Sequence, residues 1–186
     1  MSGHNKWAQI KRQKGAADVA RSRVFSRFAR LITLESKKAG GNVSAPGLTA
    51  AIARAKAANM PKDNIERAVA KGVSKDSGDL EQVLYEAYGP GGSAILINAL
   101  TDNKNRTTAE IKHLLSKRGV EVAAPGAATW AFTKTGAGYA PNEPLVEIVG
   151  EDEERLTAIL EALDEHEDVQ EVFTNVRGYE NTSDAE

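Results

Sequence analysis

The start of the chain interleaves cationic, amide and aromatic side chains, a mixture typical of surfaces that bind polynucleotides. Residues 3–14 read Gly-His-Asn-Lys-Trp-Ala-Gln-Ile-Lys-Arg-Gln-Lys. Lysine and arginine neutralise phosphates and release counterions, and an aromatic ring stacks on an exposed base. The candidate contacts in this run are Lys6, Trp7, Lys11, Arg12 and Lys14. The competing interpretation is a solvated charged arm whose tryptophan packs against the domain.

Further cations follow on segments with helical periodicity. Apolar residues from Val24 to Ile32 recur at i, i+3, i+4 and i+7, which predicts a helix over 16–38. Arg23, Arg27 and Arg30 are expected on its solvent-facing side. Four more cations in the next forty residues complete the candidate interface: Lys56, Lys62, Arg67 and Lys71. A basic excess that continues through a whole helical domain favours a nucleic-acid partner.

The overall net charge of −2 conceals a strong polarity along the chain. Residues 1–78 hold 16 Lys/Arg and 5 Asp/Glu, a net charge of +11, and residues 79–136 hold six of each. Residues 137–186 hold 2 Lys/Arg and 15 Asp/Glu, a net charge of −13. Such a chain is expected to present its basic part to a polyanion. A mitochondrial transit peptide, a helix on an anionic membrane surface and a protein–protein adaptor with an acidic docking domain are the alternatives.

Other kinds of chemistry lack the residues they need. The 186 residues include no cysteine, which excludes disulfides and Cys-ligated metal sites. His4, His113 and His166 are far apart in sequence, and no nucleophile–base set can be argued from spacing. The consecutive acids Glu151–Glu154 suit a helix start better than an active site. We therefore expect a non-enzymatic, cytoplasmic protein without cofactor, metal, membrane segment or small-molecule substrate.

Two polar loops need separate interpretations. Gly89–Gly92 reads Gly-Pro-Gly-Gly, lacks the Lys-Ser/Thr of a P-loop and precedes a strand, so a hairpin turn is expected. Thr101–Thr107 reads Thr-Asp-Asn-Lys-Asn-Arg-Thr and leads into a helix. It either offers Lys104 and Arg106 to an anion or serves only for turn formation and capping.

The order of the predicted elements indicates an α+β fold. A three-helix domain is expected over 1–78, an α+β domain over 79–177 and a polar tail over 178–186. The expected helices of the first domain cover 16–38, 48–59 and 61–72. Strands are expected at 83–88, 94–100, 128–134, 145–149 and 169–176, and helices at 106–118, with a Thr107–Glu110 capping box, and 152–165. The helices should cover one face of a single, mostly antiparallel sheet.

Five motifs together resemble the YebC/PmpR family over nearly the whole chain. The first is Gly-His-Asn-Lys-Trp at 3–7 with Ile10-Lys11 behind it, and the most specific is Ala-Lys-Ala-Ala-Asn-Met-Pro-Lys-Asp-Asn-Ile-Glu-Arg-Ala at 55–68. The others are Tyr85-Glu86 with Tyr-Gly-Pro-Gly-Gly at 88–92, the loop at 101–107, and the stretch from Asp168 to Asn175.

The resemblance implies a helical N-terminal domain followed by α+β modules, and a cytoplasmic regulator linked to nucleic acid. Bacterial members are described as DNA-binding transcriptional regulators. A mitochondrial relative is a translational activator, and bacterial members have been linked to relief of ribosome stalling, so DNA and ribosomal RNA or the ribosome both stay open as partners. The motif positions carried over as contacts are Lys6, Trp7, Lys11, Lys62 and Arg67.

The chain departs from the family pattern at one place. Members usually carry a further α+β module between the strand ending near Lys134 and the one beginning at Leu145, where this chain has only residues 135–144. We therefore expect the module to be missing and 80–134 to join 144–177 in one sheet.

Overall fold

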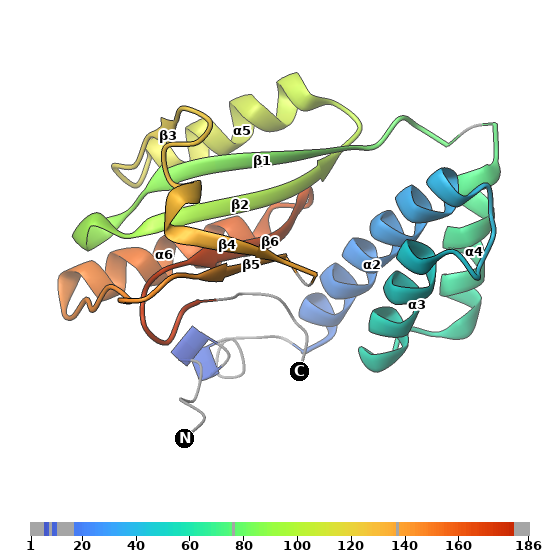
Figure 1. Ribbon diagram of the computed structural model, residues 1–186, viewed down its shortest axis with the longest axis horizontal. Helices are drawn as coiled ribbons and strands as arrows, with labels where there is room; N and C mark the ends of the chain where they lie inside the picture. Colours follow the sequence, from blue (N-terminus) through green and yellow to red (C-terminus); the bar gives the residue numbers. More distant parts are fainter. Residues whose placement is uncertain (1–5, 8, 11–16, 76, 137, 181–186) are drawn as a thin grey trace. The chain divides into compact units, whose positions relative to one another are not determined.

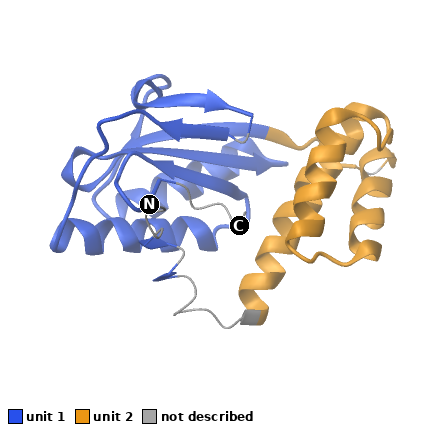
Figure 2. Ribbon diagram, turned by 60° about the horizontal axis from the view of Figure 1, so that its bottom comes forward, with its two compact units in different colours: residues 1–15, 82–183 blue, residues 16–81, 184–186 orange. Residues whose placement is uncertain are grey.

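The computed structural model describes residues 6–7, 9–10, 17–75, 77–136 and 138–180. The chain divides into two compact units, a helical unit of residues 16–81 with 184–186 and an α+β unit of residues 1–15 with 82–183 (Figure 2). The sequence instead assigns residues 1–15 to the helical domain. Trp7 accounts for this difference because its side chain lies in the core of the α+β unit. The predicted tail at 178–186 lies outside the described residues from 181 onward.

The helical unit consists of three helices around a small core. Helix α2 packs against both other helices. Each helix contributes buried side chains to the core, for example Ile32 of α2, Leu48 of α3 and Ile65 of α4. The helices are α2 (Ala17–Ala39), α3 (Pro46–Ala57) and α4 (Lys62–Val73), close to the predicted ranges. The three-helix domain expected from the 3.6-residue periodicity is thus present.

Helices α2 and α4 approach closely at Gly72. A Cβ added there would lie 2.6 Å from both the Ser36 Cβ and the Thr33 carbonyl oxygen. The Ser36 hydroxyl donates to the Val69 carbonyl at 2.7 Å, and the Thr33 hydroxyl lies 3.2 Å from the Ala68 carbonyl. A glycine is needed at this crossing, and it places the outer face of α4 firmly relative to α2.

The turn between α3 and α4 is a Schellman motif. Asn59 has a positive φ of 59°, and its N–H donates to the Lys56 carbonyl at 2.9 Å. The Met60 N–H donates to the Ala55 carbonyl at 3.0 Å, and the Met60 side chain is buried. This pairing satisfies the last carbonyls of α3, and asparagine tolerates the left-handed conformation. The chain then enters α4 directly, with Pro61 at its N-cap.

The α+β unit is built on a four-stranded sheet of order β3-β1-β2-β6 (Figure 1). Strands β1 and β3 are antiparallel with Glu86 opposite Ala123, and β2 and β6 are antiparallel with Leu96 opposite Phe173. These strands are β1 (Glu81–Tyr88), β2 (Ala94–Thr101), β3 (Val122–Ala123) and β6 (Val169–Thr174). As expected, the segment Gly89–Gly92 joins β1 to β2, with η1 (Pro90–Gly92) inside it and the Gly89 N–H donating to the Ser93 carbonyl at 2.8 Å.

Two helices cover one face of this sheet, as predicted. Helices α5 (Lys104–Ser116) and α6 (Glu151–Glu165) bury Ile111, Leu115 and Leu156 against Ile95, Ile97 and Ala99 of β2. Helix α5 begins earlier than expected because Asn103 is its N-cap. The Asn103 side chain accepts a hydrogen bond from the Arg106 N–H at 3.1 Å, so the predicted Thr107–Glu110 capping box is wrong.

The opposite face is covered by a separate hairpin, so the expectation of one sheet is wrong. Strands β4 (Phe132–Thr135) and β5 (Gly138–Pro141) pair only with each other among the described strands, and Phe132 packs with Leu96 and Phe173 of the large sheet. The turn η2 (Thr129–Ala131) replaces the first half of the strand expected at 128–134. The strand expected at 145–149 is reduced to an isolated parallel bridge between Val146 and Val176.

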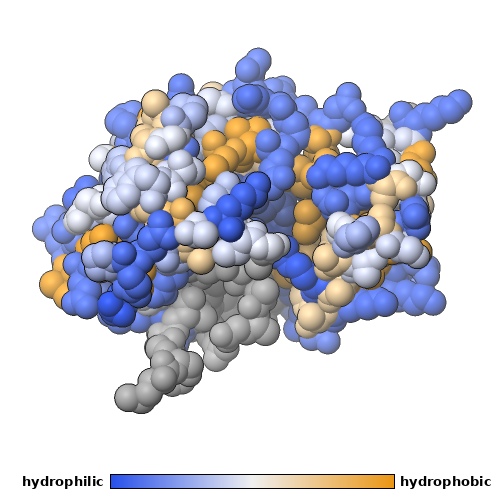
Figure 3. Space-filling view, in the orientation of Figure 1, coloured by the Kyte–Doolittle hydropathy of each residue, from blue (hydrophilic) through white to orange (hydrophobic). Residues whose placement is uncertain are grey.

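The surface that Figure 3 presents is mainly hydrophilic, with hydrophobic residues in separate groups. None of the described helices combines the length and the apolar character that a bilayer span requires.

Candidate nucleic-acid interface

The exposed half of α4 carries three of the predicted contact residues. Lys62, Arg67 and Lys71 are all exposed, whereas Ile65 and Ala68 on the other half are buried. At about 100° per residue the three cations fall within one half of the helix circumference. The helix is therefore amphipathic, and its polar half presents positive charge to solvent.

Acidic and amide neighbours on α4 orient two of these cations. The Lys62 Nζ lies 3.5 Å from Glu66 Oε1, and the Arg67 Nη2 donates to Asn64 Oδ1. The Arg67 Nε also lies 3.4 Å from the Asp63 carbonyl oxygen. Such exposed contacts within one helix contribute little to stability, so a phosphate can compete for these cations at small cost.

Lys56 adds a fourth exposed cation at the end of α3, just before the Schellman turn. Because the turn is fixed by two backbone hydrogen bonds and by buried Met60, the end of α3 and the start of α4 are held together. We call Lys56, Lys62, Arg67 and Lys71 the α3–α4 cation group.

The arginines of α2 do not form the exposed stripe that the sequence predicts. Arg27 is only 9% exposed, and Arg23 and Arg30 are half-buried. Each of these arginines precedes an apolar residue of the helix, namely Val24, Phe28 or Leu31. One residue corresponds to a rotation of about 100°, so the arginines lie beside the apolar face of α2 and not opposite it. Substitutions of Arg23 or Arg27 would therefore change packing as well as charge.

The N-terminal signature is used for packing, at least where the structure describes it. Trp7 is 2% exposed, so stacking of its ring on a base is excluded, and the alternative interpretation of a tucked tryptophan is correct. Lys6 is exposed but pairs with Glu153 at 2.7 Å, an interaction that raises the pKa of Lys6 and lowers that of Glu153. Lys11, Arg12 and Lys14 lie outside the described residues.

The division into units also weakens the charge polarity predicted from the sequence. Residues 16–81 contain 12 Lys/Arg and 7 Asp/Glu, a net charge of +5, because four cations of the basic segment precede residue 16 and two acids, Asp79 and Glu81, are added. The two acids of residues 184–186 lower the net charge of the helical unit to +3. Residues 1–15 and 82–183 contain 12 Lys/Arg and 17 Asp/Glu, a net charge of −5. The helical unit remains the basic one, but its excess charge is less than half of that estimated for 1–78.

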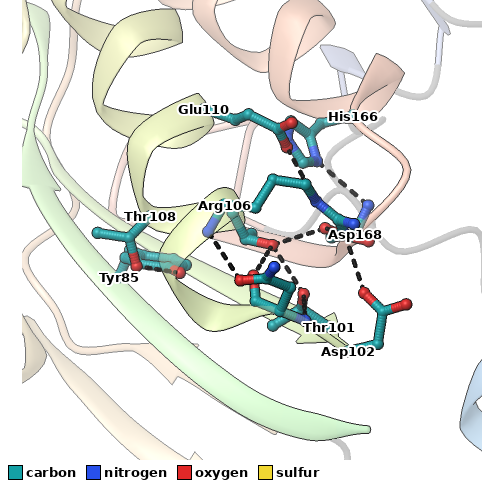
Figure 4. A network of polar contacts seen from close by, with 10 residues as sticks. Tyr85, Thr101, Asp102, Arg106, Thr108, Glu110, His166 and Asp168 are labelled. Carbon is teal, nitrogen blue, oxygen red and sulfur yellow. Dashed lines mark hydrogen bonds and ion pairs between the residues drawn. The ribbon is translucent and has the colours of Figure 1, made fainter. Parts of the chain in front are cut away.

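Side chains of the loop at 101–107 form a network of polar contacts with Asp168 (Figure 4). Asp168 is 1% exposed, and its Oδ2 accepts from the Arg106 Nη2 at 2.8 Å and from the Thr107 hydroxyl at 2.6 Å. Asp102 also pairs with Arg106, at 3.2 Å. The hydrogen bond and ion pair with Asp168 raise the pKa of Arg106, and they engage its guanidinium group in a contact within the protein. Of the two interpretations left open for this loop, capping and turn formation is the one that the structure supports.

Glu110, His166 and Asp168 lie close enough together to suggest a metal site, but their hydrogen bonds argue against one. The Asp168 N–H donates to His166 Nδ1 at 3.1 Å, so the proton of a neutral ring is on Nε2, which lies 3.1 Å from Glu110. Both ring nitrogens are therefore used, and Asp168 already accepts two hydrogen bonds. The cluster joins α5 to the connection between α6 and β6, and its members are already hydrogen-bonded to one another and to Arg106 and Thr107.

Sequence reasoning missed the structural role of Glu86. Its carboxylate is 4% exposed and accepts from the backbone N–H groups of Gly126 at 2.6 Å, Ala128 at 2.7 Å and Thr129 at 2.9 Å. Burial alone raises the pKa of Glu86, but these three donors outweigh it and hold the pKa below the usual value. The sequence feature that could have revealed this role is an acidic residue within a strand, on the same face as the apolar Leu84. A carboxylate at such a position needs hydrogen-bond donors if it is buried.

The fold therefore consists of a helical unit with exposed cations on α3 and α4 and an α+β unit. Residues 5–75 match the model of the TACO1/YebC protein N-terminal domain, and residues 80–143 match that of the TACO1/YebC second and third domain. The chain belongs to the TACO1/YebC family.

Named relatives and a solved structure agree with this assignment. A "Probable transcriptional regulatory protein" of Petrotoga mobilis is 47% identical over 94% of this chain and 70% of its own length. One of Desulfatibacillum aliphaticivorans is 45% identical over 100% of this chain and 75% of its own. The crystal structure of a conserved hypothetical protein from Aquifex aeolicus superposes with a TM-score of 0.75 at 28% identity, covering 86% of this chain and 91% of that one.

Proposed function

We propose that this protein is a non-enzymatic regulator of gene expression that binds nucleic acid through the α3–α4 cation group. The observation that carries the proposal is the exposure of Lys56, Lys62, Arg67 and Lys71 on the unit with the positive net charge. The names of the relatives, which are probable transcriptional regulatory proteins, support DNA as the first target to test. The family resemblance keeps ribosomal RNA as the second.

Charge reversal on α4 tests the proposal. The variant carries Lys62→Glu, Arg67→Glu and Lys71→Glu, all at exposed positions that leave the buried half of the helix unchanged. The control carries the same charge change on α5 and at its end, at exposed Lys104, Lys112 and Lys117. Far-UV circular dichroism checks that both variants fold.

Binding to a duplex and to a structured RNA is then measured between 50 and 200 mM salt. Four phosphate contacts predict a log–log slope of about −3.6, which lowers the association constant about 150-fold over that range. The α4 variant is expected to lose most of the affinity and to show a slope near −1, whereas the α5 control keeps both. A flat slope for the natural protein, or an equal loss in the two variants, would refute this assignment.

A further inference from the structure

The α+β unit exposes two aromatic rings side by side on the face of the sheet away from its helices. Trp130 is 68% exposed and Tyr88 is 41% exposed. Tyr88 follows Leu84 and Glu86 along the side of β1 that faces the β4–β5 hairpin, whereas Tyr85 and Ala87 face α5 and α6. We call Tyr88 and Trp130 the aromatic platform.

The polar atoms of both rings are already engaged within the protein. The Trp130 Nε1 donates to the Tyr88 hydroxyl at 2.8 Å, and that hydroxyl donates to the Ala127 carbonyl. An incoming group therefore meets ring faces and C–H edges and finds no hydrogen-bond donor on the indole. That surface suits a flat, π-rich partner.

The platform is also held in place before anything binds. Glu86 fixes the segment before Trp130 through its three backbone hydrogen bonds, and the Asn142 Nδ2 donates to the Trp130 carbonyl at 3.1 Å. The Asn142 N–H also donates to the Ala131 carbonyl at 2.8 Å. Little conformational freedom is lost when a ligand stacks on a ring that is already positioned.

The surroundings favour a base over a protein partner. In the described part of the α+β unit, the exposed large apolar side chains are Tyr88, Trp130 and Val149. Residues 124–128, which precede Trp130 and include the Ala127 carbonyl that accepts from Tyr88, are Ala-Pro-Gly-Ala-Ala and carry only small side chains. Protein docking sites are contiguous apolar surfaces, whereas base stacking requires only an accessible ring. The acidic run Glu151–Glu154 belongs to α6 on the other face of the sheet.

We propose that the aromatic platform stacks on an unpaired base, so that the protein prefers single-stranded or looped nucleic acid to a duplex. This inference rests on the proposed function and makes its target more specific. Paired bases are stacked inside the double helix and cannot reach Trp130 without being flipped out, whereas unpaired bases are available to it.

The test compares Trp130→Ala and Trp130→Phe with the natural protein. Each binds three labelled oligonucleotides of one sequence: single-stranded RNA, single-stranded DNA and a DNA duplex. We expect Trp130→Ala to bind both single strands about 5- to 150-fold more weakly and the duplex unchanged, with a smaller loss for Trp130→Phe. A loss confined to RNA also supports the inference and identifies RNA as the source of the base.

Tryptophan fluorescence supplies an independent readout, because the chain has two tryptophans and Trp7 is buried. A single strand should quench the emission of the natural protein, and Trp130→Phe, which retains only Trp7, should lose that quenching. Unchanged single-strand affinity and unchanged quenching in the Trp130 variants overturn the inference. If the α4 charge-reversal variant still loses binding in that case, the proposed function stands, and if the natural protein binds none of the oligonucleotides, both fall.

Discussion

Replacing Glu86 by glutamine tests whether one buried carboxylate holds the segment before Trp130. In the protein, Oε1 accepts from Gly126 and Oε2 accepts from Ala128 and Thr129. A glutamine has one oxygen, so it can keep the pair at Ala128 and Thr129 while its amide group opposes the Gly126 N–H. One hydrogen bond is lost and the other two lose their charge assistance.

The size of the effect follows from these three hydrogen bonds. Hydrogen bonds to charged groups contribute about 1.5–3 kcal/mol, and those between neutral groups contribute about 1 kcal/mol. We expect Glu86→Gln to lower the free energy of unfolding of the α+β unit by about 2–4 kcal/mol at pH 7. Exposed Glu121, changed to glutamine, is the matched control and should have little effect.

The effect should also depend on pH with a definite sign. The folded-state pKa of Glu86 is depressed, so its stabilising contribution is present above the unfolded pKa of about 4.3 and is lost as the pH falls through the folded value. The deficit of Glu86→Gln relative to the natural protein should therefore shrink below about pH 4.

Urea unfolding followed by tryptophan fluorescence is the appropriate assay, since Trp7 and Trp130 both belong to the α+β unit. The unfolding of the helical unit, which has no tryptophan, does not contribute directly to the signal. A variant within about 0.5 kcal/mol of the natural protein at pH 7, or a deficit that stays constant down to pH 3, would show that the three N–H donors do not act as described.

Two further substitutions probe the packing of each unit. Gly72→Ala should destabilise the helical unit by about 1–3 kcal/mol, because the added Cβ would overlap Ser36. Gly78→Ala is the control and should be nearly neutral, since no atom lies within 4 Å of its added Cβ. Thermal unfolding followed by circular dichroism at 222 nm measures both variants, and equal melting curves would contradict the close crossing of α2 and α4. Trp7→Ala should destabilise the α+β unit by about 3–5 kcal/mol, because Trp7 is buried in its core. Trp130→Ala should leave the urea unfolding midpoint of this unit, followed by circular dichroism, almost unchanged, because Trp130 is exposed. A larger loss of stability in Trp130→Ala than in Trp7→Ala would mean that Trp7 is not a core residue.

The elements with a strong apolar period could be predicted from the sequence almost to the residue. Helices α4 and α6 and strands β1 and β2 lie within a few residues of their expected ranges, since their buried positions recur at the spacing of their own structure. The incorrect predictions concern segments whose apolar pattern is short, or whose secondary structure depends on a single tertiary contact. The segment at 145–149 is short and mostly apolar, and in the described structure it forms one bridge, between Val146 and Val176.

The candidate interface could be predicted only in part, for a related reason. The cations of α4 follow from its amphipathic pattern because this helix is covered on one half only. The arginines of α2 did not, because that helix packs against both α3 and α4 and its buried arc is wider than its apolar stripe. The platform of Tyr88 and Trp130 involves two residues 42 positions apart, which no local pattern relates.

The sequence by itself determined the α+β class, the family motifs and the total number of charges in each segment, since these depend on residue type and local spacing. The tertiary structure decided which charges and rings remain in solvent. It places Trp7 of the basic arm in the core of the acidic unit and leaves Trp130 exposed. The physical reason is that burial is a property of contacts between distant segments, and two tryptophans of the same type acquire opposite roles through the neighbours that the fold gives them.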